Sequence, residues 1–290
     1  NYGLETSHPP LGAMVNSLPL LLEPDLSPPE DHRCWPDGTA RSCGREMLFY
    51  RSDTRRVLFL ARLPTMFLTL IVASLVSRWS DELFGPKAAL LSLALCALDP
   101  NILANGRLVT PDVVTTLAIF LNAYLFWRFW LRPSWSRLLP LGMALGVAGS
   151  THFGTGLLVP LVVIGSALRT WQPVEDSSIG GLRHASRARR WAITVGLLLA
   201  AGVLAALVIW AVHGFDVGPV PLWQSGRLPA PAYFNELASR LQDKSAAPHS
   251  FLLGRHYSGG WWPFFLVAFF VKTPLATILI VGLGVADLIR

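Results

Sequence analysis

Long apolar runs separated by short polar or charged connections dominate the chain. A soluble amphipathic helix places its apolar residues every three or four positions, whereas here they follow one another without that period. Runs of about 20 apolar residues are what a bilayer-spanning helix requires. Run length and punctuation predict seven spans, at residues 57–78, 87–104, 111–131, 137–151, 154–169, 191–212 and 263–288. The predicted fold class is therefore an all-α polytopic membrane protein.

The polar stretches divide the chain further. Residues 1–56 are Pro-rich and charged, and their apolar piece, Met14–Leu22, is too short to span, so it predicts an interfacial helix within a loop. Residues 57–212 form the predicted six-span core, 213–262 a second long loop, and 263–290 the last transmembrane helix. The break at Ser150–Gly154 fits a tight hairpin or one long kinked helix, and we favour the hairpin.

Composition and charge agree with a membrane protein. Of the 290 residues, 52% are hydrophobic and only 14% are charged, which excludes an ordinary soluble domain and a disordered chain. The net charge of +6 does not indicate nucleic-acid binding, because most basic residues stand between apolar runs, where they determine the orientation of the spans in the membrane. The Arg-rich connections are predicted to be cytoplasmic. Four segments then share the outer face: residues 1–56, 105–112, the His152 turn and 213–262.

Several ionisable residues lie in or beside predicted spans. Arg62 is either an interfacial anchor or a partner for a phosphate or carboxylate, and the sequence leaves both open. Lys272, two turns into the last span, either pairs with a buried carboxylate or contacts an anionic head group. Asp112 follows Thr110 and Pro111, a helix-start pattern, and stands near Arg107 as a possible ion pair. Asp99 has a similar position at the end of the preceding span.

The histidines and cysteines are weaker candidates. His152, in the predicted hairpin turn, is more often a hydrogen-bonded structural residue, and two prolines position His8 without proving a role. Cys34 and Cys43 bracket a turn-rich loop that a disulfide would close in an oxidising compartment. No metal-ligand cluster is recognisable. Gly142 and Gly146 form a small-xxx-small pair that predicts close helix packing.

Four segments resemble the membrane glycosyltransferases of family 39, the protein O-mannosyltransferase-like group with the C-type glycosyltransferase (GT-C) fold. They are His8–Leu11, Ala61–Pro64, Gly106–Asp112 and the stretch from Phe251–Gly254 through Gly260–Trp262 to Lys272–Pro274, and their order runs through nearly the whole chain. The resemblance implies a GT-C-type bundle. It also implies an inverting transferase that takes a sugar from a polyprenyl-phosphate donor and gives it to an acceptor hydroxyl on the extracytoplasmic face. No cofactor is implied, and the acceptor is a protein, a lipid or a glycan.

The resemblance also implies roles for individual residues. Arg62 and Arg107 match phosphate-side or loop-ordering cations, and Asp112 matches a supporting carboxylate. His152 stands where the family often has Lys, and Lys272 belongs to a recurrent Lys-Thr-Pro; both are candidate donor-phosphate ligands. In the family the acidic motif that carries the base lies upstream of the His-Pro-Pro segment. We therefore expect the sequence as printed to be an N-terminally truncated, inactive fragment.

Two other functions remain open. Intramembrane Arg and Lys also suit a transporter or flippase of a lipid-linked anionic substrate, although no internal repeat supports one. A membrane scaffold protein without catalytic activity is the third alternative. The predicted location is integral to a membrane, in a bacterial inner membrane with the site facing the periplasm or exterior.

Overall fold

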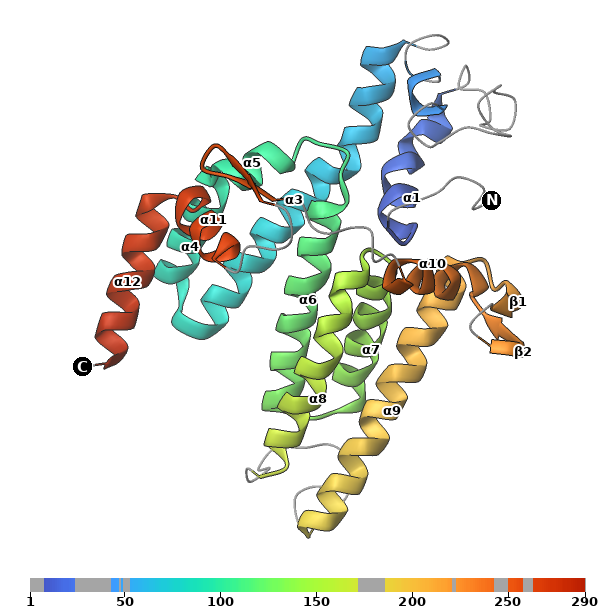
Figure 1. Ribbon diagram of the computed structural model, residues 1–290. Helices are drawn as coiled ribbons and strands as arrows, with labels where there is room; N and C mark the ends of the chain where they lie inside the picture. Colours follow the sequence, from blue (N-terminus) through green and yellow to red (C-terminus); the bar gives the residue numbers. More distant parts are fainter. Residues whose placement is uncertain are drawn as a thin grey trace.

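The computed structural model describes residues 8–23, 43–46, 48, 53–171, 186–220, 223–242, 250–257 and 263–289. Of the positions named above, Cys34 and Gly260–Trp262 lie outside these ranges. The described chain is mostly helical, as the apolar runs predict (Figure 1).

Three helices among the described residues are long and apolar enough to cross a bilayer: α3 (Thr54–Phe84), α6 (Pro111–Leu131) and α9 (Arg187–Val212). At a rise of about 1.5 Å per residue, α6 is about 31 Å long, which matches a hydrocarbon core of about 30 Å. A fourth span is present if a bent helix pair near the C-terminus counts as one. An integral membrane protein is supported, but the predicted total of seven spans is not confirmed.

Two predicted spans are interrupted at prolines. The run 87–104 divides into α4 (Pro86–Leu98) and α5 (Pro100–Asn105), because the Asp99 carboxylate accepts hydrogen bonds from the amides of Asn101 and Ile102 and starts a new helix. The predicted last span divides into α11 (Phe264–Lys272) and α12 (Leu275–Ile289), bent by 109° at Thr273–Pro274. Neither run is the single continuous helix that hydropathy predicts.

Helices α6, α7 (Trp135–Gly149), α8 (Leu158–Arg169) and α9 stand side by side as a bundle (Figure 1). Helix α8 is preceded by a 3-10 turn, Phe153–Leu157, and runs back along the bundle, so that Arg169 Nε donates to the Trp130 carbonyl 3.0 Å away near the end of α6. The predicted hairpin at Ser150–Gly154 is therefore correct. Leu138, Leu197 and Ala201 form the buried core between α7 and α9.

Small and polar residues bring the bundle helices together. Gly142 and Gly146 of α7 face α9, where a β-carbon on Gly146 would lie 2.6 Å from the Ala205 carbonyl oxygen. The fully buried Asn122 side chain donates from Nδ2 to the carbonyls of Ala118, on its own helix, and Ala144, on α7, at 2.8 and 2.9 Å. Close glycine contacts and polar bonds of this kind hold helices together where lipid removes the hydrophobic driving force.

A second group of helices leans against the bundle. Helix α3 packs on α4 and α6, and α1 (Leu11–Ser17), continued by a 3-10 turn at Leu18–Leu22, lies along α3 (Figure 1). A buried hydrogen bond of 2.9 Å from the Thr65 hydroxyl to Asn16 Oδ1 joins α1 to α3. The Arg56 guanidinium pairs with Glu23 at 2.7 Å, just after that turn. The interfacial position expected of Met14–Leu22 stays a prediction.

The segment predicted as a long loop, 213–262, contains secondary structure. An antiparallel pair, β1 (Val217–Val220) and β2 (Trp223–Pro229), aligns Val217 with Pro229 and is followed by α10 (Pro231–Gln242). A second pair, β3 (Ser250–Leu252) and β4 (Arg255–Tyr257), follows. Helix α10 lies across the ends of α7, α8 and α9 (Figure 1). The fold is therefore helical with two small hairpins rather than entirely α.

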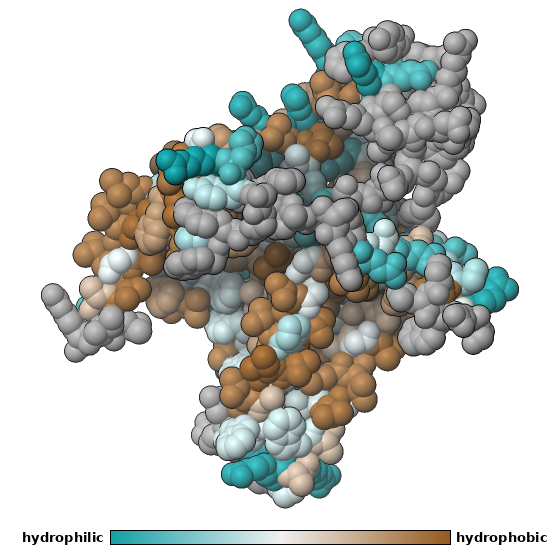
Figure 2. Space-filling view, in the orientation of Figure 1, coloured by the Kyte–Doolittle hydropathy of each residue, from teal (hydrophilic) through white to brown (hydrophobic). Residues whose placement is uncertain are grey.

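Apolar side chains cover much of the outside of the molecule. The sides of the bundle and of α12 are hydrophobic, while hydrophilic residues gather toward the ends (Figure 2). Large exposed residues include Leu199 of α9 at 66% exposure and Leu279 of α12 at 58%. An exposed apolar surface of this extent marks contact with lipid.

Candidate functional site

Four segments that lie far apart in the sequence meet at one end of the bundle, which we call the polar end: residues 8–12, 105–112, 150–154 and 213–242. The Leu11 amide donates to the Ser150 carbonyl at 3.1 Å. Gly12 packs against Pro111, and Tyr233 of α10 packs its ring on Phe153, 5.3 Å between centroids. These are the segments whose loops the charge pattern assigns to one side of the membrane.

Hydroxyl groups build the turn that presents His152. Where α7 ends at Gly149, the hydroxyls of Thr151 and Thr155 both donate to the Ala148 carbonyl at 2.8 Å, which satisfies an acceptor left open by the helix end. His152 Nδ1 accepts from the Gly154 amide at 2.9 Å. In a neutral imidazole that bond places the proton on Nε2, so His152 retains one donor nitrogen.

His8 and His152 stack on each other at the polar end. Their ring centroids are 4.5 Å apart and the ring planes are inclined by 28°. The pKa of His8 lies below its usual 6.5 chiefly because the ring is partly buried; a proton on the neighbouring His152 ring and the positive charge of Arg240 both oppose a further cation, and Asp112 acts in the opposite sense. The neutral form of His8 is therefore favoured.

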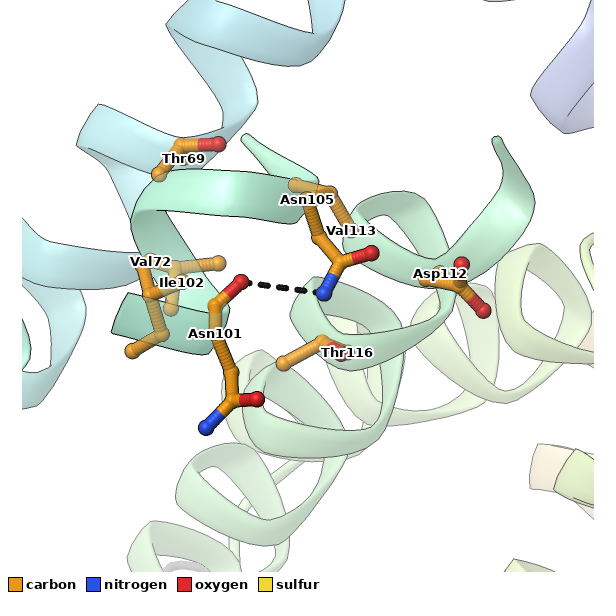
Figure 3. Close-up of a pocket in the computed structure, with 8 residues that line it drawn as sticks. All are labelled: Thr69, Val72, Asn101, Ile102, Asn105, Asp112, Val113 and Thr116. Carbon is orange, nitrogen blue, oxygen red and sulfur yellow. Dashed lines mark hydrogen bonds between the residues drawn. The ribbon is translucent and has the colours of Figure 1, made fainter. Parts of the chain in front are cut away.

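Asp112 is exposed in the first turn of α6, after Pro111 at the first helical position. Thr110 occupies the N-cap position without a side-chain capping bond, so the expected cap by this hydroxyl is not formed. The Asp112 carboxylate lines a cavity between α3, α5 and α6 (Figure 3). Asp112 thus stands between this cavity and the stacked histidines, on whose His8 its charge acts.

The two candidate arginines lie on α3 and in the connection between α5 and α6. Arg107 is exposed in the short connection between α5 and α6, and the salt bridges recorded within the described ranges do not include the expected Arg107–Asp112 pair. Arg62 is half-buried on α3. Its spacing from Thr65 and Thr69, three and seven residues on, places all three on one face of the helix.

The surroundings of Lys272 and Asp99 differ from those that the sequence predicts. Lys272 is exposed at the last position of α11, directly before the bend at Thr273–Pro274, so it is not a deeply buried lysine. Its backbone carbonyl accepts a 2.8 Å hydrogen bond from Asn101 Nδ2. The Asp99 carboxylate is engaged as the N-cap of α5 and so has a structural role.

Helix α10 contributes residues that the sequence analysis did not select. Burial raises the pKa of Glu236, with Arg240 opposing the shift, and burial also raises the pKa of Tyr233. The ring of Tyr233 meets His213 at 5.7 Å. The apolar positions 234, 237, 238 and 241 recur at helical spacing and are the signal that would have identified this helix.

The remaining predictions concern cysteines and metals. Cys43 is buried and disulfide-bonded, but Cys34 lies outside the described residues, so their pairing stays a prediction. Within the described ranges, no group of three or more His, Cys, Asp or Glu side chains gathers in a way that would hold a metal ion.

Apolar helices of spanning length, with ionisable and hydrogen-bonding groups gathered at one end, define a helical integral membrane protein with a polar site at the bundle end. Residues 54–178 match the family of dolichyl-phosphate-mannose-protein mannosyltransferases. This match supports a family-39-like membrane glycosyltransferase, as the resemblance of the motifs indicated. No curated protein and no solved structure matches the chain significantly.

Proposed function

We propose that the protein is an inverting glycosyltransferase that moves a sugar from a polyprenyl-phosphate donor to an acceptor hydroxyl on the extracytoplasmic face. The observation that carries the proposal is the family match over residues 54–178, which contains Arg62, Arg107, Asp112 and His152. The convergence of residues 8–12, 150–154 and α10 around His152 and Asp112 supports it, because a transferase needs donor and acceptor groups to meet in one place.

The reaction requires stabilisation of a leaving phosphate. When the acceptor oxygen attacks the anomeric carbon, the bond from that carbon to the phosphate oxygen breaks and negative charge builds up on the lipid phosphate. Arg62 and Arg107 are the cations we assign to this charge, and His152, whose Nδ1 accepts from the Gly154 amide, offers an N–H donor at Nε2. We assign Asp112 a supporting role and assign no residue as the base that takes the proton from the attacking hydroxyl.

The test is transfer of radiolabelled mannose from polyprenyl-phosphate mannose, in membranes that contain the full-length protein. Arg62→Ala is expected to lower the rate by about 10²–10³-fold, the usual loss for one group that stabilises a developing anion. Arg55→Ala is the matched control, because Arg55 is exposed on the same helix two turns earlier. Near-normal turnover of Arg62→Ala at normal protein levels would remove Arg62 from the phosphate site.

The same assay separates the alternatives. Donor binding without transfer by the unmodified protein would instead support a transporter or flippase, with the arginines retained as lipid-phosphate ligands. A protein that neither binds nor transfers the donor would favour the scaffold alternative.

A further inference from the structure

A small cavity lies between α3, α5 and α6, beside the polar end (Figure 3). Its volume is about 160 Å³. That is well below the roughly 300–1,000 Å³ of a pocket for a drug-sized ligand, so it suits a single ring rather than an extended molecule. Its polar lining comes from Thr69, Asn101, Asn105, Asp112 and Thr116.

Polar side chains of two helices line this cavity. Asn101 and Asn105 are four residues apart on α5, and Asp112 and Thr116 are four residues apart on α6, so each pair lies on one helix face. The connection between the helices is only the turn 106–110, which brings Asn105 and Thr116 near each other, while the Asp112 carboxylate points away from the two asparagines (Figure 3).

A glycine permits the close packing of the cavity wall. A β-carbon on Gly106 would lie 2.8 Å from Thr69 Oγ1 and 2.9 Å from the Ile102 carbonyl oxygen. A larger residue would therefore displace the Thr69 side chain on α3 or distort the last turn of α5. The glycine thus allows the end of α5 to lie against Thr69 in the cavity wall.

Most of the donor groups in the lining are already engaged. Asn101 Nδ2 donates to the Lys272 carbonyl at 2.8 Å, Asn105 Nδ2 to the Asn101 carbonyl at 2.9 Å, and the Thr69 hydroxyl to the Thr65 carbonyl at 2.8 Å. The groups without a recorded bond within the described residues are acceptors, namely both amide oxygens and the Asp112 carboxylate, together with the Thr116 hydroxyl. A ligand here must supply hydrogen-bond donors.

The apolar part of the lining narrows the choice of ligand. Val72, Ile102 and Val113 complete the wall. A hard metal cation requires oxygen ligands on every side, whereas a sugar ring has hydroxyl donors around its edge and C–H groups on its faces. The mixture of acceptors and aliphatic side chains therefore fits a pyranose.

We propose that this cavity binds the pyranose ring of the donor, with Asn105 and Thr116 determining which sugar is accepted. The proposal rests on the proposed glycosyltransferase function. Thr69 lies on the same face of α3 as Arg62, about 10 Å along the helix axis, and the turn of Arg107 joins the two cavity walls. A phosphate held at the Arg107 turn would lie at the edge of the cavity that holds the sugar.

The test compares Thr116→Val with Thr115→Val. The first removes a hydroxyl that lines the cavity, and the second removes the hydroxyl of the neighbouring residue, which does not line it. Initial rates are measured with polyprenyl-phosphate mannose and with polyprenyl-phosphate glucose, which differ in the configuration of one hydroxyl. Thr116→Val is expected to raise the donor KM about five- to tenfold and to change the preference between the two sugars, as the loss of one hydrogen bond would. Thr115→Val is expected to change neither.

A second variant and a stability measurement complete the test. Asn105→Ala is expected to act in the same direction as Thr116→Val, and melting temperatures in detergent show that both variants are folded. An increase in the KM for the acceptor with an unchanged donor KM would overturn the donor assignment in favour of an acceptor sugar. Unchanged kinetics in both folded variants, with an active unmodified protein, would refute the cavity proposal and leave the proposed function standing. An unmodified protein inactive with both donors would refute the function itself.

Discussion

The contact between α7 and α9 makes a quantitative prediction about stability. At Gly146, an added β-carbon would lie 2.6 Å from both the Ala205 carbonyl oxygen and the Val208 β-carbon, a separation that real contacts do not allow. Backbone atoms of α9 are part of the obstacle, so a side-chain rotation alone cannot relieve it. Gly146→Ala must therefore move the two helices apart. Gly196, on α9, has no atom within 4 Å of an added β-carbon.

The two substitutions are expected to change the free energy of unfolding in opposite directions. Replacing Gly by Ala within a helix gains about 1 kcal/mol of helix propensity at either site. At Gly146 this gain is opposed by overpacking, which costs about 1–3 kcal/mol in a close-packed interior. The variants Gly146→Ala and Gly196→Ala are therefore expected to differ in free energy of unfolding by about 1–3 kcal/mol, with Gly196→Ala the more stable.

The assay is thermal unfolding of each purified variant in the same detergent. At about 2–4 °C per kcal/mol for a chain of this size class, a 2 kcal/mol difference lowers the melting temperature of Gly146→Ala by about 4–8 °C relative to Gly196→Ala. Equal melting temperatures would show that α7 and α9 do not approach as closely as described. A more stable Gly146→Ala would refute the packing argument altogether.

Two further predictions concern the polar end and the first loop. Folding lowers the pKa of His8 from 6.5, so its contribution to stability is present above about pH 6.5 and is lost as the pH falls below that value. Between pH 7.5 and 5, the melting temperature should therefore decline less in His8→Phe than in the unmodified protein. An unchanged decline would contradict the stacked arrangement with His152. We also predict a Cys34–Cys43 disulfide, which closes a short loop and contributes on the order of 2–3 kcal/mol; a mass measurement without reductant that finds two free thiols would exclude it.

The sequence predicts the long continuous helices well and the interrupted ones poorly. Helices α6 and α9 follow directly from apolar runs of spanning length, for which a bilayer leaves few alternatives. The break between α4 and α5 was missed because hydropathy remains high on both sides of it. An N-cap aspartate followed by proline, as at Asp99–Pro100, is a local signal that average hydropathy cannot register.

The candidate site was predicted in its ingredients but not in its arrangement. Charge counting places the segments of His8 and His152 on one side of the membrane, yet the stacking of their rings depends on how α1 docks on the α7–α8 hairpin. Asn105 and Thr116 were not selected, because an isolated amide or hydroxyl carries no charge signal. Their significance arises only when α5 and α6 fold back across the turn and face each other.

The docking of residues 8–12 also determines when this part of the protein is completed during synthesis. The Leu11 amide and the His8 ring find their partners on Ser150 and His152, which leave the ribosome roughly 140 residues later. At about 5–20 residues per second, the delay is about 7–30 seconds. For that interval the first segment can contact the α5–α6 turn through Gly12 and Pro111, but it lacks its contacts to the α7–α8 hairpin. The docking of residues 8–12 is thus timed by the insertion of the α7–α8 hairpin, and α10 completes the polar end later, when Tyr233 packs on Phe153.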